Sequence, residues 1–343
     1  MKAYKNILII KMSSLGDVLH ALPTVYALRE NCPEARIVWA VHPAFSPVLP
    51  GKPYIDDVVY IDKKRLSSLT YWRELRRILY GYHFDLCLDL QGLAKSAVVA
   101  FNSGAEEKYG YWEMREGSFL ISKGLAGPNK HGHVIERYLD TVRCLGGIVD
   151  AVEFPLPHID GERAGIMGRL ASDGLIGDYL AVVPGARWTV KEWPVAHWQT
   201  FLSRVTASGM NVVLLGSNAD IPKGAAISGS LSSDHVFDYT GKTSLRELMA
   251  AIAMSRLYIS ADTGPLHIAN ALKKELIALF GPTCPDRTGP YGGKNSSYIH
   301  MMISPTSRAT AEHPLINDPD CMSQITVAAV WKTFESVIKK VKK

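Results

Sequence analysis

Short apolar runs alternate with segments of helical periodicity along the first half of the chain. The apolar runs predict strands at residues 6–11, 36–41, 57–62 and 84–91. The intervening segments carry apolar residues every three or four positions, which predicts helices at 18–30, 69–80, 93–101 and 133–145. Strands that alternate with helices in this way form a parallel sheet that is covered on both faces.

The same alternation starts again after a proline-containing segment at 153–161, which we interpret as a linker. Further strands are expected at 179–185, 210–217, 257–262 and 276–282. Further helices are expected at 162–171, 195–207, 220–230, 245–253 and 325–343. The fold class is therefore α/β, with two doubly wound domains and a cleft between them. Ligands of such domains bind beyond the carboxyl ends of the strands, so the turns that follow strands are candidate sites.

Composition and charge narrow the possible functions. The chain has 343 residues and a formal net charge of +5, which favours anionic partners, although an ordinary solvated surface also gives such a charge. No RNA-recognition motif, helix-turn-helix or zinc finger is present, so nucleic acid is not an expected partner. No apolar run reaches about 18 residues and no N-terminal secretion signal is evident, so any membrane contact is expected to be peripheral.

Metal and covalent chemistry find no support in the sequence. The 5 cysteines are widely spaced and form no C-x-x-C pair, which is typical of reduced thiols in the cytosol. The motifs H-E-x-x-H and G-x-S-x-G are absent. We therefore expect no metal site.

The stretch KMSSLGDVLHALP, at 11–23, places a carboxylate where the first strand turns into a helix. One interpretation of Asp17 is structural, because aspartate is favoured at helix N-termini. The other is that Asp17 projects into the cleft as a general base, while Gly16 allows a ligand to approach closely. The turn contains neither a dinucleotide-binding fingerprint nor a P-loop motif.

Two post-strand turns in the second half carry groups suited to a diphosphate. The loop at 182–194 bears Arg187 and Lys191, which could clamp a diphosphate; the alternative is a surface loop anchored by Trp188 and Trp193.

The turn at 261–272 offers the backbone N–H groups of a helix start and the Thr263 hydroxyl to an anion. His267 belongs either to this site or to the protein core. Three weaker candidates are the strand-end turns at 89–97, 214–220 and 280–292.

Six motifs occur in an order that resembles the bacterial lipopolysaccharide heptosyltransferases of glycosyltransferase family nine. They are KMSSLGDVLHALP, DLQGLAKSA, PGARWTVKEWP, LLGS, SADTGPLHIANAL and FGPTCPDRTGPYG. The resemblance covers most of the chain, 6–330, and the form of the first motif is most similar to heptosyltransferase I. The chain departs from the pattern at Ala186 and Arg187, where some members carry a pair of hydroxyl residues.

This resemblance implies a GT-B fold of two facing Rossmann-like domains. The acceptor-binding domain would span 1–158 and the nucleotide-sugar-binding domain 159–325, and a C-terminal helix at 326–343 would cross back to the first domain. The implied reaction is an inverting, metal-independent transfer of L-glycero-D-manno-heptose from ADP-heptose to Kdo of the lipopolysaccharide inner core, without a cofactor.

The resemblance also implies roles for individual residues. Asp17 would be the catalytic base that deprotonates the acceptor, and Lys191 would hold the donor diphosphate. The other implied donor-binding residues are Ser14, Gly16, Gly216, Ser217, Thr243, Asp262, Thr263, Gly264 and His267. The implied acceptor-binding residues are Lys63, Lys64, Arg65, Gln91 and Lys95.

The first domain also carries a basic helix with Arg73, Arg76 and Arg77, which suits either an anionic membrane leaflet or a solvated face. We expect a cytoplasmic monomer that associates peripherally with the inner membrane.

Two alternatives remain open at this point. One is a family-nine enzyme with another donor or acceptor, such as heptosyltransferase II or an enzyme of another surface glycan. The other is a non-catalytic nucleotide- or sugar-binding protein.

Overall fold

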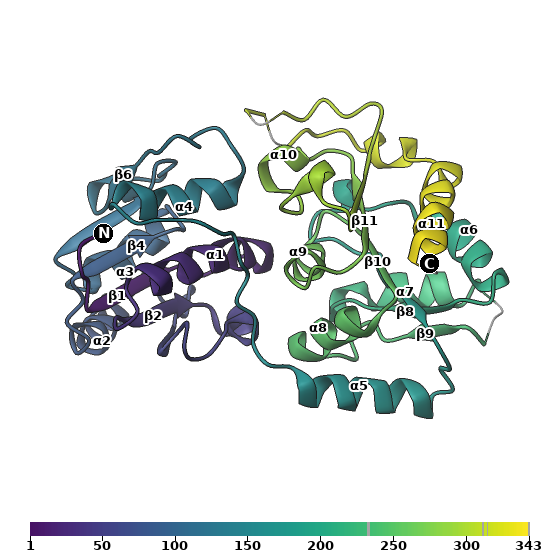
Figure 1. The fold of residues 1–343 in the computed structure, drawn as a ribbon, viewed down its shortest axis with the longest axis horizontal. Helices are drawn as coiled ribbons and strands as arrows, with labels where there is room; N and C mark the ends of the chain where they lie inside the picture. Colours follow the sequence, from purple (N-terminus) through teal and green to yellow (C-terminus); the bar gives the residue numbers. More distant parts are fainter. Residues whose placement is uncertain (232–233, 311, 314, 342–343) are drawn as a thin grey trace. The chain divides into compact units, whose positions relative to one another are not determined.

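The computed structural model describes residues 1–231, 234–310, 312–313 and 315–341. The chain forms two compact units, Met1–His158 and Ile159–Lys343. Each unit holds a parallel sheet with helices packed against it (Figure 1). The α/β fold class that the alternating pattern predicts is therefore confirmed.

The sheet of the first unit has the strand order β3-β2-β1-β4-β5-β6. Its strands are β1 (Asn6–Ile10), β2 (Arg36–Val41), β3 (Asp57–Tyr60), β4 (Leu86–Asp89), β5 (Glu107–Tyr111) and β6 (Lys123–Leu125). Its helices are α1 (Leu15–Asn31), α2 (Leu69–Tyr80), α3 (Ala94–Asn102) and α4 (Val134–Cys144), with short 3₁₀ helices η1 (Pro43–Val48) and η2 (Ser118–Leu120).

Helices cover both faces of this sheet. The crossovers from β1 to β2 and from β3 to β4 run in opposite directions across it, so right-handed connections place α1 and α2 on opposite faces. Leu8 and Ile10 of β1 share a hydrophobic core with α2 and α3. Ile7 and Ile9 are equally buried and point to the other face, since side chains alternate along a strand.

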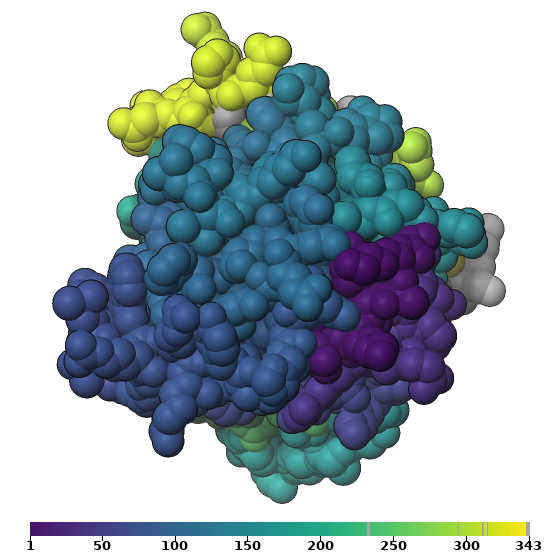
Figure 2. Space-filling view, turned by 90° about the vertical axis from the view of Figure 1, so that its left-hand side faces the viewer, coloured from purple at the N-terminus to yellow at the C-terminus, as the bar shows by residue number. Residues whose placement is uncertain are grey.

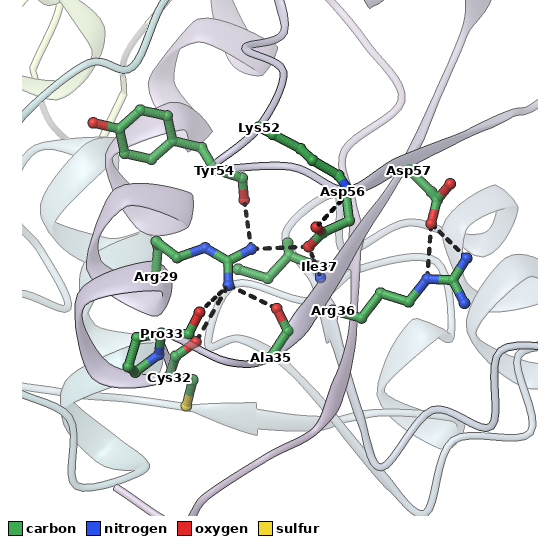
Figure 3. A network of polar contacts seen from close by, with 10 residues as sticks. All are labelled: Arg29, Cys32, Pro33, Ala35, Arg36, Ile37, Lys52, Tyr54, Asp56 and Asp57. Carbon is green, nitrogen blue, oxygen red and sulfur yellow. Dashed lines mark hydrogen bonds and ion pairs between the residues drawn. The ribbon is translucent and has the colours of Figure 1, made fainter.

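Arg29 fixes the C-terminal end of α1 (Figure 3). Its guanidinium group donates hydrogen bonds to the carbonyl oxygens of Pro33 and Ala35, each at 2.7 Å, and to Asp56 Oδ2 at 2.9 Å. Asp56 Oδ2 also accepts from the backbone N–H of Ile37 in β2. These contacts tie α1 to the strand that follows it, which fixes the direction of the helix whose first turn carries Asp17.

The second unit repeats this architecture, with the strand order β12-β11-β10-β7-β8-β9. Its strands are β7 (Tyr179–Val183), β8 (Asn211–Leu214), β9 (Val236–Asp238), β10 (Leu257–Ala261), β11 (Leu276–Phe280) and β12 (Ile299–Ile303). Its helices are α5 (Asp160–Ser172), α6 (Val195–Ala207), α7 (Ile221–Ser228), α8 (Leu245–Met254), α9 (Gly264–Ala271), α10 (Pro285–Thr288) and α11 (Val327–Val341). The 3₁₀ helices are η3 (Thr189–Lys191), η4 (Asn218–Asp220), η5 (Gly293–Asn295) and η6 (Cys321–Gln324).

The last helix, α11, packs on α6 of the second unit. Val330, Phe334 and Val337 enter the hydrophobic core there, and Phe334 meets Phe201 edge to face with ring centroids 5.7 Å apart. The Trp193 indole N–H donates to the Ile325 carbonyl oxygen at 2.8 Å, which fixes the entry of the chain into this helix. The crossing of this helix to the first domain stays a prediction, and residues 342 and 343 of the expected segment lie outside the described residues.

Both sheets have the strand order of a doubly wound fold, in which the connections change direction between two neighbouring strands. This point lies between β1 and β4 in the first unit and between β7 and β10 in the second. Ligands of open α/β sheets bind at the carboxyl ends of these two strands. The turns after β1, β4, β7 and β10 are therefore the positions at which a site is expected in each unit.

Candidate active site

Asp17 lies in the first turn of α1, directly after β1. Ser14 is the N-cap of this helix, and Asp17 Oδ2 accepts hydrogen bonds from the Ser14 backbone N–H at 2.9 Å and from its hydroxyl at 2.6 Å. Asp17 is thus the N3 residue of a capping box rather than the N-cap itself. In the part of the chain that the structure describes, its second oxygen, Oδ1, accepts no hydrogen bond and so keeps its lone pairs for another group.

Side chains from two other strand ends hold the loop that precedes α1. Gln91 Oε1, after β4, accepts from the backbone N–H groups of Met12 at 3.1 Å and Ser13 at 3.2 Å. Lys63 Nζ, after β3, donates to the Ser13 hydroxyl at 2.9 Å. We call Ser13, Ser14, Asp17, Lys63 and Gln91 the first-unit cluster. It brings four of the sequence-predicted residues to one loop: the base, one donor-binding residue and two acceptor-binding residues.

The turn after β4 is organised around Asp89, which is fully buried. Its carboxylate accepts from the backbone N–H groups of Gln91 and Gly92 and from the Ser96 hydroxyl at 2.8 Å. Burial raises the pKa of Asp89, and these hydrogen bonds act to lower it. Gly92 has a φ of +66°, which a residue with a side chain adopts only with strain. The turn therefore presents Gln91 in a fixed position.

Among the described residues, no side-chain hydrogen bond to this loop comes from the remaining first-unit candidates. Lys64 and Lys95 are exposed, and Gly16 is the second residue of α1. Arg65 forms an ion pair with Glu74 of α2 at 2.8 Å and lies over the Tyr71 ring. Among these acceptor-binding candidates, Arg65 already has a carboxylate partner, whereas Lys64 and Lys95 form no ion pair with the described residues.

The second unit brings Lys191, Asp262 and His267 together, and we call these three residues the second-unit cluster. Lys191 Nζ lies 2.7 Å from Asp262 Oδ2, and His267 Nε2 lies 3.7 Å from Asp262 Oδ1. Burial by itself would raise the pKa of Asp262, but the neighbouring His267 side chain and the Lys191 ammonium outweigh it and hold this pKa well below its usual range. The site therefore contains a carboxylate that stays ionised and a lysine side chain that is oriented by it.

The backbone next to this cluster suits an anion. Thr263 is the N-cap of α9, and the helix begins at Gly264. The first N–H groups of a helix have no partner within the helix and carry the positive end of its dipole. His267 is buried in the first turn, so it belongs both to the core and to the surroundings of Asp262.

The loop that carries Lys191 is held by its neighbour Glu192. Glu192 Oε1 accepts from the Ala186 N–H at 3.0 Å and forms an ion pair with Lys223 of α7. Of the two tryptophans that would anchor this loop in the alternative interpretation, Trp193 is buried, but 52% of Trp188 is exposed. Trp188 therefore does not anchor the loop, and the carboxylate of Glu192 closes it instead.

A second capping box forms the turn after β8. Asp220 Oδ2 accepts from the Ser217 backbone N–H at 2.7 Å and from its hydroxyl at 2.8 Å. A Cβ atom at Gly185 would lie 1.8 Å from Asp220 Oδ1, and one at Gly216 would lie 2.9 Å from Asp220 Cβ. Both strand ends therefore need glycine, because they close directly on this side chain.

Thr243, another donor-binding candidate, follows β9 and precedes the N-cap of α8. Its hydroxyl oxygen is buried and forms no hydrogen bond with the described residues. A buried hydroxyl without a partner is uncommon, so this atom is available to a ligand or to a water molecule.

Sequence reasoning missed two residues that shape these turns. Asp220 follows Ser217 at the same three-residue spacing as Asp17 follows Ser14, and this repeated pattern could have drawn attention to it. Glu192 has no such signal, since its partners Ala186 and Lys223 become neighbours only through the fold.

Among the described residues, no three histidine, cysteine or carboxylate side chains gather in a way that could hold a metal ion. No helix in the described part of the chain is long and apolar enough to cross a membrane.

A family model for glycosyltransferase family 9 (heptosyltransferase) matches residues 72–313, which include parts of both units and every candidate residue of the second. The chain belongs to this glycosyltransferase family. The family membership expected from the six motifs is thereby confirmed. The alternative of a non-catalytic binding protein is replaced by a sugar-transferring enzyme.

Individual relatives are also heptosyltransferases or family 9 glycosyltransferases. Lipopolysaccharide heptosyltransferase 1 of Pseudomonas aeruginosa is 29% identical over 307 residues, covering 86% of this chain and 83% of that protein. Among solved structures, a family 9 glycosyl transferase from Veillonella parvula aligns with a TM-score of 0.83 and 22% identity over 98% of both chains. Escherichia coli heptosyltransferase WaaC with ADP aligns with a TM-score of 0.75 and 23% identity over 97% of this chain and 99% of that one. These structural likenesses show the fold, and the expected GT-B fold class is confirmed.

Proposed function

We propose that this glycosyltransferase moves L-glycero-D-manno-heptose from ADP-heptose to a Kdo sugar of the lipopolysaccharide inner core, with inversion and without a metal ion. The observation that carries the proposal is the position of Asp17. It lies in the first turn of the helix after β1, at the point where the sheet connections change direction. Its Oδ1 accepts no hydrogen bond from the described residues. The names of the relatives, a lipopolysaccharide heptosyltransferase 1 and a heptosyltransferase with ADP, support a heptose as the sugar, lipopolysaccharide as the acceptor and ADP as the nucleotide.

In the proposed reaction, Asp17 accepts the proton of the acceptor hydroxyl. The acceptor oxygen then forms a bond to the anomeric carbon of the heptose, and the bond from that carbon to the diphosphate oxygen breaks. The electron pair leaves with ADP, and a single displacement inverts the anomeric centre. One carboxylate suffices for this sequence, because no covalent sugar–enzyme intermediate has to form.

The second-unit cluster is proposed to stabilise the departing diphosphate. Lys191 and the N–H groups at the start of α9 would supply the positive charge that meets the developing negative charge of ADP. Asp262 keeps the lysine ammonium in place at 2.7 Å. Thr243, Gly216 and Ser217 lie at other strand ends of the same unit and are proposed to complete the donor site.

Lys63 is proposed as the main acceptor-binding cation, since it contacts the loop that carries Asp17. Kdo is a carboxylated sugar, and a lysine near the base suits such an acceptor. Lys64, Lys95 and the amide nitrogen of Gln91 would add further donors. Arg65 would have to break its ion pair with Glu74 before it could bind the acceptor, so it is the least favoured of the five acceptor-binding candidates.

A second candidate is a family 9 enzyme that uses another nucleotide sugar or another acceptor, such as a heptosyltransferase II. Ala186 and Arg187 favour this candidate, because some heptosyltransferase I members carry two hydroxyl residues there. Arg187 is exposed and forms no ion pair with the described residues.

For either enzyme, the proposed location is the cytoplasmic face of the inner membrane. The protein is proposed to associate with this membrane peripherally and as a monomer.

Thermal unfolding with ADP, UDP or GDP, each in EDTA and again with magnesium, tests this proposal. ADP at about 100 times its Kd should raise the unfolding free energy by about 2.7 kcal/mol, which shifts the melting temperature clearly. The shift should be the same with and without magnesium. A larger shift with UDP or GDP would favour the second candidate, and a shift that needs magnesium would contradict the metal-independent site.

A further inference from the structure

The helix α2 exposes a stripe in which two arginines lie between a leucine and a tyrosine. Leu69, Arg73, Arg76 and Tyr80 follow one another at spacings of four, three and four residues, so they line one side of the helix. The opposite side is fixed in the core by Leu75, Leu79 and Tyr71. The stripe therefore faces away from the sheet, at the surface of the first unit, of which Figure 2 shows one side.

The charge of this stripe is not neutralised within the protein. Glu74 is the one acidic residue among 69–80, and it pairs with Arg65 outside the helix. Arg73, Arg76 and Arg77 are exposed, and none of them forms an ion pair with the described residues. Arg76 instead donates to the Tyr80 hydroxyl at 2.7 Å and lies over its ring.

Apolar side chains continue this surface onto the neighbouring elements. Phe101 of α3 is 48% exposed and lies next to Trp72 of α2, with ring centroids 6.4 Å apart. The 3₁₀ helix η2, which packs against α3, exposes 62% of Phe119 and 78% of Leu120. Large exposed apolar side chains that gather on one surface are typical of an interaction site.

We propose that this surface, Leu69, Arg73, Arg76, Tyr80 and Phe101, docks the protein on an anionic lipid bilayer. Arginine groups bind lipid phosphates, while leucine and aromatic side chains enter the boundary between headgroups and acyl chains. A nucleic acid or an acidic protein would satisfy the charges but would give no reason for Leu69 and Phe101 to be exposed beside them. This inference names the surface for the peripheral membrane association proposed above. It rests on the proposed function only in taking the inner membrane as the bilayer that is bound.

Sedimentation of the full chain with vesicles tests the proposal. The protein should bind vesicles of phosphatidylethanolamine and phosphatidylglycerol but not vesicles of phosphatidylcholine alone, and salt at about 0.5 M should weaken the binding. The double variant Arg73→Glu/Arg76→Glu should bind the anionic vesicles at least about tenfold more weakly. Leu69→Ser should weaken binding without changing its salt dependence.

Matched controls lie in the second unit. Arg204→Glu changes an exposed arginine of α6 that has no ion pair with the described residues, and Ile176→Ser changes a side chain that is 88% exposed. Both should bind vesicles like the wild type. All variants should keep wild-type melting temperatures and wild-type transfer to a lipid-free acceptor, so that loss of docking is separated from failure of the proposed reaction. Equal binding of the Arg73→Glu/Arg76→Glu variant and the wild type would overturn the proposal, as would retention by RNA in place of anionic vesicles.

Discussion

Replacing Asp17 with asparagine is expected to lower the rate of sugar transfer by about 10²–10⁴-fold, which is the usual effect of removing a general base. Asparagine has the same shape and can still accept the hydrogen bonds from Ser14, so the first turn of α1 should remain intact. ADP binding should be unchanged, because the base is proposed to act on the acceptor. Initial rates of ADP release with saturating donor, together with a thermal-shift titration with ADP, measure the two effects separately.

A matched control is Glu247→Gln in α8, where Ser244 and Glu247 form another capping box. This change removes the same charge from the same helix position, together with an ion pair to Arg169, but lies outside the clusters. It should cost about 1 kcal/mol of stability and leave turnover unchanged. If Asp17→Asn behaves like Glu247→Gln, Asp17 is a structural cap and the base lies elsewhere.

The Lys191→Met variant is expected to lose transfer by about 10²–10³-fold, because the charge that stabilises the leaving diphosphate disappears. It should also lose about 3 kcal/mol of unfolding free energy, since Asp262 is left buried without its lysine partner. The double variant Lys191→Met/Asp262→Asn should regain most of that stability, because no unpaired carboxylate remains, yet it should stay inactive. Urea unfolding and steady-state kinetics on the same samples give both quantities.

Lys223→Met provides the comparison for this prediction. It removes a lysine of similar exposure, 18% against 20%, from the ion pair with Glu192 next to Lys191. Its loss of stability should approach that of Lys191→Met, and its loss of transfer should be clearly smaller. Recovery of transfer in the double variant, or equal kinetic losses in the two lysine variants, would show that Lys191 acts only through the structure.

The sequence pattern predicts the buried part of both sheets well. Strands such as β2 and helices such as α2 and α6 have the expected bounds, because their apolar residues follow one clear period. Four strands, β5, β6, β9 and β12, were not predicted. They are short or lie toward the sheet edges, and their mixture of polar and apolar residues gives no continuous buried run.

Strand ends were predicted too long where the turn itself is apolar. The expected strand 84–91 is observed as Leu86–Asp89, because Asp89 starts a turn that bends the chain at Gly92. The expectation that ligands bind just beyond strand ends nevertheless led to the candidate site. Groups that directly follow strands, such as Asp17, Gln91 and Asp262, could be selected from the order of residues alone, since the carboxyl ends of parallel strands share one edge.

Contacts between distant residues could not be predicted in this way. The pairing of Arg65 with Glu74 and of Glu192 with Lys223 depends on where helices pack. So does the choice between a core and a site role for His267, which the structure places against Asp262. A periodic pattern fixes which face of a helix is buried, but it does not say which side chain of another element will meet it.

The most direct test of the proposed function is a product analysis with the purified protein, ADP-heptose, a soluble Kdo-bearing acceptor and EDTA. Mass spectrometry and NMR of the acceptor would be followed alongside ADP release. We expect one heptosyl group to be transferred for each ADP released, with inverted anomeric configuration and no need for a metal ion. Release of ADP without a glycosylated acceptor, a retained configuration, or transfer only after a divalent metal is added would contradict it.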